Sequence, residues 1–144
     1  MTNLNQHRTG TRSIARSALA LFAGFIATVV LSLVTDLGLH DLGVMPSPGQ
    51  PMSDALLLIA TAYRTIYGTI GAFVVARLAP SRPLQHALIG GAIGTALSAL
   101  GLVVTWNQDL GPHWYPVALV LLALPSAWVG GKFAIAQIAN RPRP

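Results

Sequence analysis

An arginine stands inside a stretch of residues that is otherwise uncharged and apolar. Arg64 shares one helical face with Tyr63 and Tyr67, given 3.6 residues per turn. A guanidinium beside tyrosine hydroxyls can form a small-anion or substrate site at the floor of an outward-facing vestibule. It can equally form a structural ion pair that fixes helix register, because helical side chains lean toward the helix N-terminus, and Asp36 lies on that side. Asp109 is a second candidate partner.

Two similar acidic segments offer a different chemistry. Asp36 and His40 frame one segment, and Asp109 and His113 frame the other with the same spacing. Two imidazoles and two carboxylates that converge could hold Zn or Mn. The alternative is that these side chains are solvated loop residues or helix caps.

Several other chemistries are excluded by missing residue types. The chain has no Cys and no Glu, so it carries no thiolate site and no H-E-x-x-H zinc motif. It also has no Walker A, G-x-G-x-x-G or G-x-S-x-G segment. The sequence therefore implies no cofactor.

The composition indicates an integral membrane protein. Hydrophobic residues make up 53% of the 144 residues, charged residues only 9%, and the mean hydropathy is +0.59. A soluble domain carries about 25% charged residues. Four segments have the roughly 20 apolar residues that a spanning helix needs. They predict an all-α transmembrane four-helix bundle over residues 13–138, with spans at about 15–36, 54–78, 84–106 and 114–137. We expect residues 1–12 to be a disordered cytoplasmic N-terminus and residues 139–144 a cytoplasmic tail.

The basic residues predict how the spans are oriented. Of nine Lys and Arg, all but Arg64 lie at or beyond the span ends on one side: near the start of the first span, around the second connection, or near the end of the fourth span. The four Asp lie at the span ends or in the connections on the other side. This one-sided bias places both termini in the cytoplasm, and we expect a bacterial inner-membrane protein. It also accounts for the net charge of +5, so the lipid bilayer rather than nucleic acid is the expected partner.

Local features fit these spans. Trp106, Trp114 and Tyr115 lie where an aromatic belt is expected at the outer membrane interface. Pro125 lies inside the fourth span, where a missing N–H is expected to kink the helix.

The two halves of the chain resemble each other. The two Asp-x-x-x-His segments follow the first and third spans. In addition, Gly71 and Phe73 match Gly131 and Phe133 at an offset of sixty. These matches predict a tandem duplication of a two-helix hairpin, related by a pseudo-two-fold axis along the membrane normal.

Much of the chain resembles a group of small four-span bacterial membrane proteins. The resemblance is carried by Ala62-Tyr-Arg-Thr-Ile-Tyr-Gly68, by Ala76-Arg-Leu-Ala-Pro-Ser-Arg-Pro83 and by His86-Ala87. That group has no assigned function, so the resemblance implies fold and location only. Small multidrug exporters are similar only in size, because the chain lacks the acid that they carry in their first span.

These observations favour a non-enzymatic structural, accessory or interaction protein of the membrane, with Arg64 as an internal polar anchor. The alternative is an oligomeric transporter or small-anion-binding protein that uses Arg64, Tyr63, Tyr67 and Asp36. A third class is a membrane enzyme with a metal site at its outer face. A second copy of the chain or another membrane protein is the expected protein partner.

Overall fold

A computed structural model describes residues 2–47, 49–108 and 111–140, and side chains from residue 13 onward. In these ranges the chain forms an all-α bundle with four helices and no strands. The helices are α1 (Thr2–Asp41), α2 (Asp54–Leu78), α3 (Pro83–Thr105) and α4 (Trp114–Ala139).

All four described helices are long and apolar enough to cross a membrane. In α1 the candidate spanning segment ends at Asp41, five residues beyond the expected end, and the other three helices match the expected spans to within two residues. The helix of α1 also continues back to Thr2, through the segment that the sequence predicts as disordered. Residues 2–12 contain no proline, and Gly10 is their only strong helix breaker.

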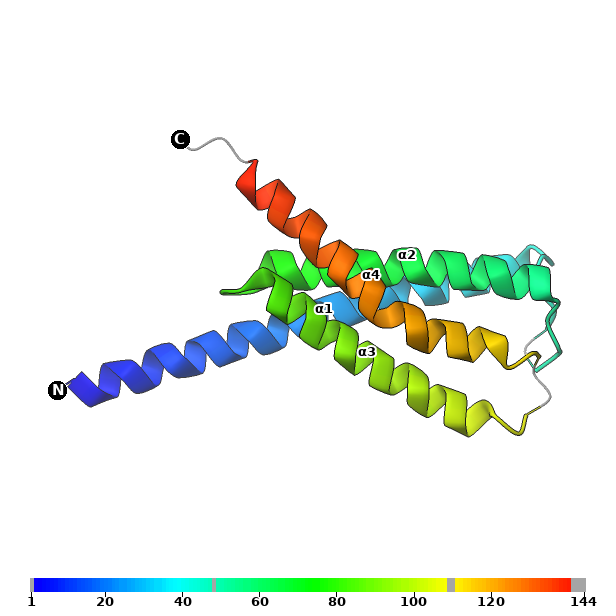
Figure 1. Cartoon of the computed structure of the whole chain (residues 1–144), viewed down its shortest axis with the longest axis horizontal. Helices are drawn as coiled ribbons and strands as arrows, with labels where there is room; N and C mark the ends of the chain where they lie inside the picture. Colours follow the sequence, from blue (N-terminus) through cyan, green and yellow to red (C-terminus); the bar gives the residue numbers. More distant parts are fainter. Residues whose placement is uncertain (1, 48, 109–110, 141–144) are drawn as a thin grey trace.

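The helices run antiparallel along the chain (Figure 1). The α1–α2 and α3–α4 connections lie at one end of the bundle, which we call the loop end. The start of α1, the end of α4 and the α2–α3 turn lie at the other end, the terminal end. The N-terminal part of α1 projects beyond the other helices.

The pair α2 and α4 forms the centre of the bundle. These two helices share the largest interface, α1 packs mainly on α2, and α3 packs mainly on α4. The helices α1 and α3 make little direct contact. One polar link joins them near the terminal end, where His86 Nε2 lies 2.9 Å from Ser17 Oγ. Toward the loop end, α3 diverges from α1 and α2 (Figure 1).

The interior is built from small residues, as helix association in lipid requires. Its core cluster consists of alanines, with Phe73 packed against it: Ala72, Ala76, Ala87, Ala127 and Ala134. Many large apolar side chains are exposed instead, which suits a surface that faces hydrocarbon.

Pro125 lies within α4, as the sequence shows, and α4 changes direction part-way along its length (Figure 1). The proline lacks the N–H that would bond the preceding turn, which accounts for the bend. Ser126 Oγ donates to the Ala123 carbonyl at 2.9 Å and so satisfies a backbone acceptor close to the bend.

Candidate functional site

The structure brings Asp36 and Arg64 together across the α1–α2 interface. Arg64 Nη2 donates to Asp36 Oδ2 at 2.6 Å. Arg64 is ten residues beyond Asp54, so it lies about 15 Å along α2 from the loop end. Its side chain leans back toward that end and meets Asp36 in the last turns of α1. The direction of the helix, read from the sequence, predicts this contact.

Tyr63 completes the pairing of the carboxylate. Its hydroxyl donates to Asp36 Oδ1, so both carboxylate oxygens accept hydrogen bonds. The Arg64 guanidinium also lies 5.9 Å from the centre of the Tyr63 ring, within range of a cation–π interaction. The three side chains form a network with no net charge, which we call the polar anchor.

Tyr67 has a different partner from the one that the sequence suggests. Its hydroxyl lies 2.8 Å from Thr35 Oγ1, and its ring centre lies 5.7 Å from that of Tyr63. Its carbonyl accepts a bond from Thr28 Oγ1 at 3.3 Å. Tyr67 therefore ties α2 to α1 beside the polar anchor, rather than coordinating Arg64.

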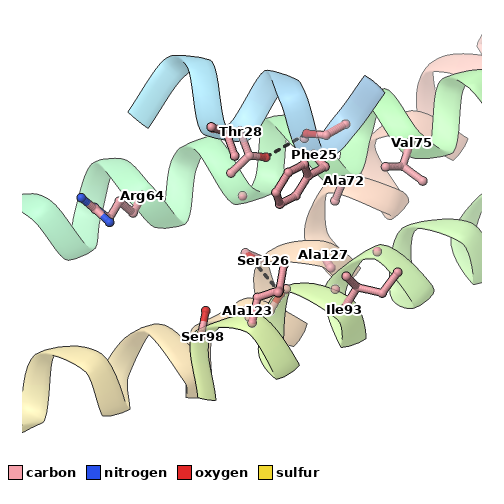
Figure 2. A pocket seen from close by; sticks show the side chains of 18 of the residues that line it. Phe25, Thr28, Arg64, Ala72, Val75, Ile93, Ser98, Ala123, Ser126 and Ala127 are labelled. Atoms are coloured by element: carbon pink, nitrogen blue, oxygen red, sulfur yellow. Dashed lines mark hydrogen bonds between the residues drawn. The ribbon is translucent and has the colours of Figure 1, made fainter. Parts of the chain in front are cut away.

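Two cavities adjoin Arg64. The first, which we call the vestibule, is about 330 Å³ and lies at the loop end. The second, which we call the cleft, is about 560 Å³ and lies between the helices at mid-depth (Figure 2). Among the described residues, Arg64 is the one that lines both. Its Nε atom is buried and has no hydrogen-bond partner in the described part of the chain.

Tyr115 is a vestibule residue that sequence reasoning missed. It stands in the first turn of α4 and lines the vestibule together with Arg64, Tyr63 and Asp36. Its position near the start of the fourth span predicts only a place in the aromatic belt at the membrane interface. Only the packing of α4 against α2 reveals that it faces the polar anchor.

The metal hypothesis can be examined for three of its four candidates, since Asp109 lies outside the described residues. His40 Nδ1 donates to the Asp36 carbonyl at 2.7 Å, and His113 Nε2 donates to the Trp106 carbonyl at 2.8 Å. The Asp36 carboxylate is occupied by Arg64 and Tyr63. Among the described residues, no three His, Cys, Asp or Glu side chains are placed to share a metal ion.

The polar anchor is therefore suited to holding α1 and α2 together. Its carboxylate is hydrogen-bonded at both oxygens, and its guanidinium is a permanent donor that cannot accept a proton. The vestibule and the cleft beside it offer space for a ligand. No family model, curated protein or solved structure matches the chain.

Proposed function

We propose that this chain is a non-enzymatic integral membrane protein with a structural, accessory or interaction role, in which the polar anchor holds α1 to the rest of the bundle. The observation that carries the proposal is the intramembrane pair between Asp36 and Arg64. A lone charge in a span costs at least about 2.5–3.5 kcal/mol. Here each charge is neutralised by the other, so the cost is offset only while α1 and α2 stay together.

The position of α1 explains why such an anchor is needed. It packs mainly on α2, and its apolar span is the least buried of the four together with that of α3. Lipid tails are as apolar as its side chains, so apolar surface alone does not drive α1 onto α2. The polar anchor, together with the close contact of Gly71 with Gly24, holds α1 in place on α2.

The proposed setting is the bacterial inner membrane, with the terminal end in the cytoplasm. The positive-inside bias of the sequence supports this orientation. Duplication of a hairpin is also proposed. In support, Gly71 packs on Gly24 of its own hairpin, and the matching Gly131 packs on Leu84 and Ala87 of the other.

A double-mutant cycle tests the polar anchor. Arg64→Met and Asp36→Asn are made singly and together, and unfolding is followed in detergent. We expect each single variant to be less stable than the parent. The double variant should lose less unfolding free energy than the sum of the two single losses, with a coupling energy of about 0.5–3 kcal/mol. Arg77→Met, on the same helix but remote from Asp36, is the matched control and should not couple. Independent effects at positions 36 and 64 would remove the anchor role.

A second candidate is an oligomeric transporter or small-anion-binding protein that uses Arg64, Tyr63 and Tyr67. The vestibule beside Arg64 and the unpaired Nε atom favour it. An anion would then have to compete with Asp36 for the guanidinium. Sulfate, phosphate and short carboxylates should raise the melting temperature of the parent but not of Arg64→Met. No shift with any of these anions would count against this candidate.

A further inference from the structure

The cleft is a cavity inside the bundle that the polar anchor does not occupy. All four helices line it: α1 and α2 form one side, and α3 and α4 form the other (Figure 2). Phe25 and Thr28 look into it from α1, while Ile93 and Ser98 border it from α3. Most of its lining is apolar. An occupant that fits this lining would therefore be mainly hydrocarbon.

The rim of the cleft is open to the surroundings at mid-depth. The apolar side chains that line it from α1 and α3 are exposed; Phe25 is 47% exposed and Leu97 48%. The two helices make little direct contact there. In a bilayer this opening faces lipid chains, so a molecule can enter sideways from the membrane.

The volume of the cleft decides between two kinds of apolar occupant. A transmembrane helix of 20 residues is about 30 Å long and about 10 Å wide, or roughly 2,400 Å³. The cleft holds about 560 Å³, within the range of about 300–1,000 Å³ typical of small-molecule sites. It is too small to enclose a helix from a partner, and its size suits a hydrocarbon chain.

The polar end of the site lies at Arg64, where the cleft adjoins the vestibule. The vestibule is lined by hydrogen-bonding and aromatic side chains, including Gln50, Trp106, Gln108 and Tyr115. Arg64 Nε is a buried donor at this junction and has no partner among the residues that the structure describes. The charge of Arg64 is already balanced by Asp36, so an anionic group would leave a net negative charge. The donor therefore fits an uncharged acceptor such as an ester or hydroxyl oxygen.

We propose that the cleft and vestibule form one binding site for an amphiphile, with a hydrocarbon chain in the cleft and an uncharged oxygen-bearing head at Arg64 in the vestibule. The site goes beyond the anchor role, because Asp36, Arg64 and Tyr63 keep their mutual bonds when it is filled.

Two glycines of α3 provide a matched pair for the test. Gly94 lines the cleft and Gly101 does not, yet a Cβ atom at either position meets no other atom within 4 Å. The full chain is purified in detergent as the parent, Gly94→Phe and Gly101→Phe. Each is titrated with mono-oleoylglycerol and with its phosphate ester, which has the same chain and an anionic head. Native mass spectrometry counts the bound molecules.

We expect the parent and Gly101→Phe to retain one mono-oleoylglycerol, and Gly94→Phe to bind it at least about tenfold more weakly. The phosphate ester should bind the parent more weakly than mono-oleoylglycerol does. Ser98→Leu is a smaller change in the same cleft and should also weaken binding. It replaces Gly94→Phe in the comparison if that variant fails to fold.

Three results would overturn the proposal. Equal binding by all variants would mean that the lipid merely coats the helices. A parent that retains no stoichiometric mono-oleoylglycerol would exclude the site. Equal or tighter binding of the phosphate ester would show that the head group is anionic. None of these results depends on the coupling of Asp36 with Arg64, so the anchor and this site can fail separately.

Discussion

The bundle is held together in two different ways at its two ends. At the loop end, polar side chains link α2 to its neighbours: Arg64 bonds Asp36 of α1, and Trp114 Nε1 of α4 donates to Asp54 Oδ1 at 2.7 Å. Nearer the terminal end, α2 crosses its neighbours at close range, and the contacts are between backbones. A Cβ on Gly71 would lie 2.7 Å from the Gly24 carbonyl oxygen.

The difference follows from the residue types that meet at each contact. Where glycine and alanine allow backbones to touch, dispersion and close packing hold the helices, and no polar group is needed. At the loop end, the long side chain of Arg64 reaches across from α2 to Asp36 on α1. The vestibule lies at that end, whereas the cleft extends from Arg64 to the close crossing, where Gly24 and Gly71 line it.

The largest expected effect is at the close crossing. Gly130→Leu would place a Cβ 2.9 Å from the backbone nitrogen of Phe73 and 3.0 Å from Ala72 Cβ. Backbone atoms cannot move aside as a side chain can, so we expect a loss of about 3 kcal/mol or more in unfolding free energy, measured in detergent. Gly101→Leu, at an open position on α3, is the control. Equal stability of the two variants would mean that the crossing is not close-packed.

Water access should differ between the vestibule and the cleft. Tyr115 and Leu122 are seven residues apart on α4, and they line the vestibule and the cleft respectively. Because the chain has no native Cys, Tyr115→Cys and Leu122→Cys each carry one thiol. We expect a water-soluble maleimide to label position 115 at least about tenfold faster in lipid nanodiscs. Faster labelling at position 122 would show that the cleft is a water-filled path, which favours the transporter candidate.

The smallest expected effect is at Tyr67, beside the polar anchor. Tyr67→Phe keeps the ring beside Tyr63 and removes only the hydroxyl that pairs with Thr35. We expect a loss of about 0.5–1.5 kcal/mol in unfolding free energy, the usual net value of one hydrogen bond. Thr35→Val should cost a similar amount, and the double variant no more than either one. Additive losses would show that the two hydroxyls act separately.

The candidate site was only partly predictable from the sequence. Arg64, Asp36 and Tyr63 could be placed together because a charge in a span must turn away from lipid and its side chain leans toward the helix N-terminus. The partner of Tyr67 could not, because its face of α2 meets α1 at Thr35, and nothing local specifies that register. Tyr115 was assigned to the interface because an aromatic residue near a span end has no distinctive pattern.

The four candidate spans could be read from the sequence, because the length of an apolar segment alone decides whether it can cross hydrocarbon. So could the side chain of α2 that must be paired inside the bundle. Which helices lie side by side depends on the packing of the whole bundle, since every span presents small residues at similar spacing and apolar faces are equivalent in lipid. The separation of α1 from α3, and with it the cleft, follows from how α2 and α4 cross rather than from any one segment.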